Sequence, residues 1–237
     1  MKKPFKFKQF TVNQDRCAMK IGTDGVLLGA WASISDLPES ILDIGAGTGI
    51  IALMLAQRSN ADTIDAIEID ADAFEQCVEN FEASPWADRL FCYHASLGEF
   101  LDEVDDKYDL IISNPPFYSE DVSSGDGARD LARQNSSLPF RFLLKGVIKL
   151  LSKNGIFTII IPFKEEKEVL KEAANIGLYP GRLLRVKGHL ESEVKRSLLE
   201  FHLKKTPVLK SELILEKERH KYTEDYINLT KDFYLKM

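Results

Sequence analysis

The stretch "ILDIGAGTGI", residues 41–50, decides the fold of this chain. Its apolar run predicts a buried strand, and three glycines follow directly, at Gly45, Gly47 and Gly49. Glycines at a strand-to-helix turn let the backbone approach a ligand closely, and the next helix offers free N–H groups and a positive dipole end. The dinucleotide-binding fingerprint would require a glycine where this chain has Ile50. The turn therefore predicts a ligand site of another kind, and the alternative is a tight turn without a ligand.

Short apolar runs alternate with segments of helical period along the following chain. The predicted strands are residues 41–45, 62–70, 89–95, 108–114 and 155–162. The predicted helices between them are residues 48–58, 70–83 and 138–153. Such alternation implies right-handed crossovers onto a parallel sheet. We expect an α/β fold with a Rossmann-like, mostly parallel sheet and helices on both faces.

The pattern changes after residue 164, where a predicted helix ends at Gly177, a natural C-cap. Two predicted strands follow without a helix between them, at residues 178–190 and 194–205. Consecutive strands with a short connection are most simply antiparallel. The sheet is therefore expected to close with an antiparallel strand pair.

One domain with three parts accounts for the whole chain. Residues 1–40 are expected to form an N-terminal lid or helical segment, residues 41–205 the core, and residues 206–237 a C-terminal extension packed on that core. The extension ends in a predicted helix over 223–237, with Thr223 as its N-cap.

Composition limits the classes of partner and site. The formal net charge of −6 excludes a protein that coats nucleic acid by bulk positive charge, so any such contact must come from a local patch. Three cysteines stand far apart, with no C-x-x-C pair or Cys/His cluster, which indicates reduced thiols, a cytoplasmic protein and no metal. No apolar run is long enough to span a membrane, and nothing indicates an obligate protein partner.

The form "DIGAGTG", residues 43–49, resembles motif I of class I S-adenosylmethionine-dependent methyltransferases. This resemblance implies a class I methyltransferase sheet, and S-adenosyl-L-methionine as the cofactor of the core. It also implies that Asp43 helps to hold the cofactor's amino group, directly or through water. The turn's backbone would pack on the cofactor's methionine and ribose, through Gly45, Ala46, Gly47 and Gly49.

Polar residues at the next strand ends extend this predicted cofactor site. Glu68 lies about twenty residues beyond the glycines, where a carboxylate can accept both ribose hydroxyls. Its neighbour Ile69 joins the expected cofactor contacts, whereas Asp70 is expected to cap the next helix. The family commonly carries an aspartate for the cofactor's adenine at the position that matches Ser96. Ser96 can accept one hydrogen bond there, or it can serve as a helix N-cap.

The stretch "NPPFY" follows the strand predicted at 108–114. Two prolines lack N–H donors and fix the backbone, so the turn is rigid and its carbonyls are free to accept. The side chain of Asn114 and the carbonyl of Pro115 would accept the two hydrogens of a substrate NH₂ group and orient its nitrogen toward an electrophilic methyl group. The alternative is a rigid surface turn with its aromatic rings packed inward. The residues predicted for catalysis and base stacking here are Asn114, Pro115, Pro116, Phe117 and Tyr118, with Asn114 also beside the cofactor.

The N-P-P-F sequence resembles the motif of amino-group methyltransferases, which act on base amines or on a glutamine side-chain amide. Further segments resemble the bacterial tRNA1(Val) adenine N6-methyltransferase family, namely residues 10–32, 127–139 and the chain end. The resemblance covers essentially the whole chain and implies methylation of the adenine just 3′ of the anticodon. It implies a lid from Lys20 to Gly25. The residues it places near the cofactor's methionine or facing the RNA are Thr23, Asp24, Arg129 and Arg133.

A basic stretch over 182–205 predicts an RNA surface on this acidic chain. It holds seven lysines and arginines against three glutamates, and the N-terminus adds lysines interleaved with Phe5 and Phe7. Cations pair with phosphates and aromatic rings stack on exposed bases. The alternative is charged faces of edge strands, which block aggregation. The basic residues selected for RNA contact are Arg182, Arg185 and Lys187.

The sequence therefore predicts transfer of a methyl group to N6 of adenine 37 in tRNA1(Val). Two alternatives stay open at this point. One is N5-methylation of a protein glutamine, and the other is a catalytically silent RNA-binding module with a methyltransferase-like fold.

Overall fold

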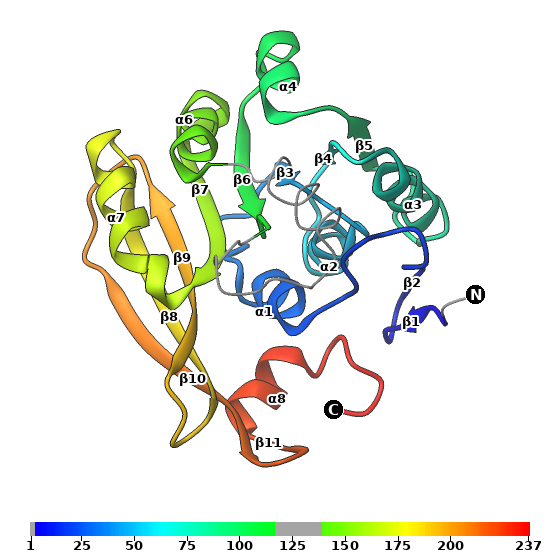
Figure 1. Ribbon diagram of the computed structural model, residues 1–237. Coiled ribbons are helices and arrows are strands. Elements are labelled where there is room, and N and C mark those ends of the chain that lie inside the picture. The colour runs from blue at the N-terminus through cyan, green and yellow to red at the C-terminus, as the bar shows by residue number, and fades with distance from the viewer. Residues whose placement is uncertain (1–2, 117–138) are drawn as a thin grey trace, which may run out of the picture.

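The structure is a computed structural model that describes residues 3–116 and 139–237 (Figure 1). Within these residues a nine-stranded sheet has the order β11-β10-β8-β9-β7-β6-β3-β4-β5. The strands are β3 (Ser40–Ile44), β4 (Thr63–Glu68), β5 (Leu90–His94), β6 (Tyr108–Ser113), β7 (Leu151–Pro162), β8 (Tyr179–His189), β9 (Val194–His202), β10 (Leu209–Glu218) and β11 (Lys221–Tyr222). The helices are α1 (Thr23–Trp31), α2 (Ile50–Arg58), α3 (Ala71–Glu82), α4 (Leu97–Glu103), α6 (Phe140–Leu150), α7 (Glu166–Asn175) and α8 (Glu224–Thr230), with a 3₁₀ turn η1 (Phe163–Glu165).

Five neighbouring strands, from β7 to β5, pair in parallel. β9 then pairs antiparallel with both β7 and β8, which confirms the α/β sheet that closes with an antiparallel pair. The sheet continues further than the sequence indicated, because β10 pairs in parallel with β8 and β11 turns back on the end of β10. A separate two-stranded ribbon joins β1 (Phe5–Lys6) and β2 (Thr11–Val12).

Helices cover both faces of the sheet and give it two apolar cores (Figure 1). One core includes side chains of α1, α2, α3 and the chain ends, and the other includes side chains of α4, α6 and α7. The central strands carry apolar residues on both faces because both faces are buried. α1 is buried from Gly25 to Trp31, and a Cβ on its Gly29 would lie 2.8 Å from the sulfur of Met54 on α2. This close packing holds the N-terminal segment against the core.

Several element ends differ from the predictions. β7 begins at Leu151, so the helix expected over 138–153 stops earlier and the strand expected at 155 starts earlier. Thr223 caps α8 by accepting the Tyr226 N–H, as expected, but α8 ends at Thr230.

The aromatic residues of the N-terminus are not a free stacking platform. Phe7 is buried and stacks on Phe10 and Tyr234, with ring centroids 4.7 and 5.9 Å apart. Phe5 packs against Phe7 at 4.7 Å. The expected stacking of RNA bases on Phe7 is therefore wrong, because its ring is buried in the core beneath the chain ends, whereas stacking on the half-buried Phe5 stays a prediction.

None of the helices within 3–116 and 139–237 is long and apolar enough to cross a membrane. The same residues contain no group of three or more His, Cys, Asp or Glu side chains arranged to hold a metal ion.

Candidate active site

A cavity of about 990 Å³ opens at the edge of the sheet where the parallel strands β3, β6 and β7 end. The ends of β3, β6 and β7 contribute its floor and one wall, and the start of α1 and the start of β9 complete it. Its lining residues are 19–25, 45–48, 50–51, 114–116, 162–164 and 193–196. Parallel α/β sheets bind ligands at this edge, so the position agrees with the expected site.

The glycine turn forms the floor of the cavity. Gly45, Gly47 and Gly49 have φ values of +77°, +57° and +76°, which favour glycine. The N–H groups of Gly45 and Ala46 donate to the carbonyl of Ile67 at 2.9 and 3.1 Å, which ties the turn to β4. A Cβ at Gly45 or Gly47 would meet no atom within 4 Å among the described residues, so the backbone there faces open space.

Asp43 is fully buried between the end of β3 and the first turn of α2. Its Oδ2 accepts the Ala52 N–H at 3.3 Å, whereas Oδ1 has no hydrogen-bond partner among the described residues. Burial raises the pKa of Asp43 to about 7; the Ala52 N–H opposes this shift, and the charge of Glu68 adds to it. A buried carboxylate with an unused acceptor is costly to ionise unless a cation or donor reaches it. The group therefore suits a ligand that carries an amino group.

Glu68 ends β4 and fixes the glycine turn from the other side. Its carboxylate accepts the N–H groups of Gly47 at 2.8 Å and Asp70 at 2.9 Å. Each oxygen retains a further lone pair that a ribose hydroxyl can use. The unused acceptor of Asp43, the carboxylate of Glu68 and the open glycine backbone together fit S-adenosyl-L-methionine.

The other predicted cofactor residues fall into two groups. Lys20, Thr23 and Asp24 line the cavity on the side of α1. Ile69 and Ser96 lie at the same sheet edge outside the cavity lining, and Ile69 is 57% exposed.

Helix caps account for two of the polar residues at this edge. Asp70 caps α3 by accepting the Ala73 N–H at 2.9 Å, as expected. Ser96 accepts the Glu99 N–H at 3.2 Å while Glu99 accepts the Ser96 N–H at 2.9 Å, a capping box at the start of α4. The cap predicted for Ser96 is confirmed, and its contact with the cofactor's adenine stays a prediction.

Asn114, Pro115 and Pro116 line the cavity beside the glycine turn. The buried Ser113 hydroxyl donates to the Ile44 carbonyl at 2.8 Å, which fixes the end of β6 to the end of β3. The Asn114 turn and the glycine turn therefore share one cavity. Four further predicted residues lie outside the described residues, namely Phe117, Tyr118, Arg129 and Arg133.

The three basic residues selected on β8 are each engaged by a carboxylate. Arg182 pairs with buried Glu200 at 3.0 Å and lies over the Trp31 ring at 4.3 Å. Arg185 pairs with Glu166 at 2.6 Å. Lys187 pairs with Glu212 at 3.2 Å. None of the three lines the cavity, so their contact with RNA stays a prediction. Such contact would require each ion pair to open or to be shared with an RNA phosphate.

The cavity wall also includes Phe163 and Lys164, which were not among the predicted site residues, and Lys195 and Arg196, which were predicted only as part of the basic RNA surface over 182–205. A signal existed for the first two, because they directly follow a predicted parallel strand and so lie at its ligand-binding end. The second two reach the cavity only because β9 runs antiparallel to β7. Arg196 donates to Asp24 at 2.7 Å and so links β9 to α1 across the cavity.

Comparison with known proteins agrees with this geometry. The family model for the methyltransferase small domain matches residues 25–173. A curated protein from Flavobacterium johnsoniae, named tRNA1(Val) (adenine(37)-N6)-methyltransferase, is 59% identical over 234 residues, which cover 98% of this chain and 100% of that protein.

Solved structures share the fold at low sequence identity. A "predicted O-methyltransferase" from Agrobacterium tumefaciens has a TM-score of 0.66 and 16% identity, over 89% of this chain and 96% of that one. P. horikoshii TYW2 in complex with MeSAdo has a TM-score of 0.57 and 15% identity, over 84% and 69% of the two chains. Because the family model matches and the 59% identity extends over nearly the full length of both chains, this chain belongs to the tRNA1(Val) (adenine(37)-N6)-methyltransferase family.

Proposed function

We propose that this protein methylates N6 of adenine 37 in tRNA1(Val), with S-adenosyl-L-methionine as the methyl donor. The observation that carries the proposal is the shared cavity, in which the Asn114 turn lies beside the glycine turn at the carboxyl ends of β3 and β6. The name of the relative from Flavobacterium johnsoniae supports this choice of substrate.

The chain's own residues would hold the cofactor from two sides. Asp43 and Glu68 supply carboxylate acceptors, and the glycine turn supplies close backbone contact. Lys20, Thr23 and Asp24 face the same space from the side of α1. When bound, the cofactor supplies an electrophilic methyl group on a positively charged sulfur.

Asn114 and Pro115 would hold the substrate amine. The Asn114 amide oxygen and the Pro115 carbonyl would accept the two N6 hydrogens, which orients the nitrogen and withdraws its lone pair from the adenine ring. No general base is required, because nitrogen becomes strongly acidic once it is methylated. Phe117 would stack on the adenine, and Tyr118 would form a second wall.

The RNA would approach the cavity as a single-stranded loop. A base in an anticodon loop costs less to turn out than a base in a duplex, which favours a single-stranded loop as the substrate. The contacts of Arg129, Arg133, Arg182, Arg185 and Lys187 with this RNA, and a cytoplasmic location with the tRNA pool, belong to the proposal.

The direct test uses purified protein, labelled S-adenosyl-L-methionine and total tRNA from cells that lack this gene. The expected product is N6-methyladenosine at position 37 of tRNA1(Val). Label in a protein glutamine, or no transfer at all, would replace the proposal with one of its alternatives.

Asn114→Ala should lower kcat by about 10²- to 10³-fold, because one acceptor on the reacting amine is lost. Cofactor binding, measured by calorimetry with S-adenosylhomocysteine, should change little. Asn228→Ala, at an exposed position on α8, is the matched control and should retain full activity. A parallel loss of cofactor binding in Asn114→Ala would assign Asn114 a structural role instead.

A further inference from the structure

The mouth of the cavity is positively charged in a chain whose formal net charge is −6. Among the charged lining residues, Arg196 is paired with Asp24 at 2.7 Å. Three exposed lysines then remain, Lys20, Lys164 and Lys195, against one exposed glutamate, Glu193. None of these lysines has a carboxylate partner within the described residues.

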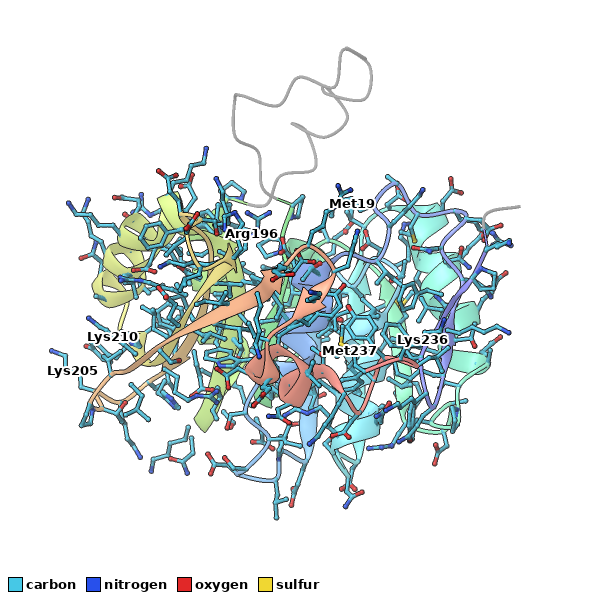
Figure 2. All side chains as sticks on the ribbon, turned by 90° about the horizontal axis from the view of Figure 1, so that it is seen from below. Met19, Arg196, Lys205, Lys210, Lys236 and Met237 are labelled. Atoms are coloured by element: carbon cyan, nitrogen blue, oxygen red, sulfur yellow. The ribbon has the colours of Figure 1, made fainter. Side chains whose placement is uncertain are left out.

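The two signs of charge are separated by depth. Asp43 and Glu68 are buried at the glycine turn, where a cationic cofactor fits, and the lysines stand at the exposed rim. A rim of lysines disfavours a cation and attracts phosphate. Figure 2 shows Met19 and Arg196, which both line the cavity, near each other at one edge of the molecule, with Lys205 and Lys210 away from it.

Phe163 adds an apolar ring to this rim. It follows β7 in η1, lines the cavity and is 37% exposed. The Arg185 guanidinium lies 5.2 Å from the centroid of its ring. An exposed ring beside exposed cations is the arrangement with which proteins hold single-stranded nucleic acid, through base stacking and phosphate pairing.

Hydrogen bonds to the buried Glu166 carboxylate hold the chain that follows η1 at the cavity mouth. Glu166, at the start of α7, accepts from the Arg185 Nε at 3.1 Å and from the Ser197 hydroxyl at 2.5 Å. Arg185 also donates through Nη2 to the other Glu166 oxygen at 2.6 Å. These bonds anchor the chain directly after Phe163 and Lys164 to β8 and β9.

We propose that Phe163, Lys164 and Lys195 form an RNA-contacting rim. Phe163 stacks on a base of the anticodon loop at the cavity mouth, and the two lysines pair with the phosphates that flank it. The inference rests on the proposed function and adds the substrate contacts that the Asn114 turn does not supply. In this arrangement Arg185 is a positioning residue, because it binds the Glu166 carboxylate and lies over the Phe163 ring.

The test measures binding of an anticodon stem-loop RNA by fluorescence anisotropy at several salt concentrations, together with KM for the full tRNA. Phe163→Ala should weaken RNA binding about 10-fold, since one stacked base contributes about 1.4 kcal/mol. Lys164→Gln and Lys195→Gln should each reduce the slope of log K against log salt by about 0.7 to 0.9, the loss of one phosphate contact. Binding of S-adenosylhomocysteine should stay unchanged in all three.

Two matched controls come from the same chain. Phe142 is also an exposed phenylalanine, 43% exposed on α6 and outside the cavity lining. Lys153 is an exposed lysine near the start of β7, the strand whose other end leads into Phe163, and it lies outside the cavity lining. Phe142→Ala and Lys153→Gln should bind the stem-loop like the unmodified protein.

The outcomes separate this inference from the proposed function. Normal RNA affinity and an unchanged salt slope in the rim variants of an active enzyme would overturn the inference alone. An unmodified protein that methylates no tRNA would instead overturn the proposed function. Phe163→Leu, which retains apolar volume without an aromatic face, guards against a folding defect and should also lose affinity.

Discussion

Gly47 and Gly49 lie two residues apart in one turn, yet an added methyl group meets different surroundings at each. A Cβ at Gly49 would lie 2.6 Å from the Phe81 ring and 2.8 Å from the Cys77 sulfur, whereas a Cβ at Gly47 meets no atom of the described residues within 4 Å. Both have positive φ, which costs an alanine about 1 to 2 kcal/mol. Gly49→Ala adds an overpacking cost of about 1 to 3 kcal/mol.

We therefore predict that Gly49→Ala lowers the free energy of unfolding by roughly 3 kcal/mol, and Gly47→Ala by about 1 kcal/mol. Gly47→Ala should nevertheless weaken binding of S-adenosylhomocysteine, because its methyl group enters the cavity. Urea denaturation and calorimetry measure the two effects. Equal destabilisation with unchanged cofactor binding would contradict the assignment of this turn.

Asp43 makes the stability of the protein depend on pH. Burial raises its folded-state pKa to about 7 from an ordinary value of 3.8. Its contribution to stability is therefore fully present below about pH 4 and is lost as pH rises through 7. Without cofactor, the urea midpoint should fall between pH 5.5 and pH 8 by more in the unmodified protein than in Asp43→Asn. If both proteins showed the same pH dependence, Asp43 would not be the group responsible.

At the scale of elements, η1 depends on an ion pair that crosses from β8 to α7. Burial alone would raise the pKa of Glu166, but hydrogen bonds from Arg185 and Ser197 hold it below its ordinary value. The pair therefore stabilises the fold above the ordinary glutamate pKa, and this contribution is lost as pH falls through the lowered pKa. Glu166 is 9% exposed in this pair, and Arg185 is 39% exposed.

Arg185→Met should lower the free energy of unfolding by roughly 2 kcal/mol, less than for a fully buried pair because solvent reaches the guanidinium. Lys187→Met is the matched control on the same strand, since its partner Glu212 is 44% exposed and such pairs contribute about 1 kcal/mol or less. Urea denaturation at pH 7 compares the two. A smaller loss in Arg185→Met than in Lys187→Met would rule out an anchoring role.

The sequence predicted the parallel half of the sheet because each of its strands is a local apolar run that ends in a turn. Half of the ten residues of β10 are charged and only Leu213 is buried, so the strand showed no such signal at the sheet edge. The floor of the cavity followed from glycine and proline motifs, which are also local. The pairing of Arg182 with Glu200 and of Arg185 with Glu166 depends on strand register across the sheet, which no local pattern contains.

At the scale of the whole molecule, the two chain ends close one core together. The Lys8 N–H donates to the Phe233 carbonyl at 2.8 Å, and Phe7 forms a bridge with Tyr234. Phe233 is 2% exposed and Phe7 is 4% exposed, within the same apolar core as α1 and α2. Residues that follow α8 therefore support the segment that leads into the cavity at residue 19.

We predict that Phe233→Ala lowers the free energy of unfolding by about 3 to 5 kcal/mol and that unfolding keeps a single transition. Leu235→Ala, at a side chain that is 57% exposed, is the matched control and should change stability by less than about 0.5 kcal/mol. Hydrogen exchange should show faster exchange of the amides of β1 and β2 in Phe233→Ala, because their aromatic neighbours lose a packing partner from the other end of the chain. A separate early transition confined to the chain ends would instead show that the chain ends fold independently of the sheet. In that case they would not support the cavity.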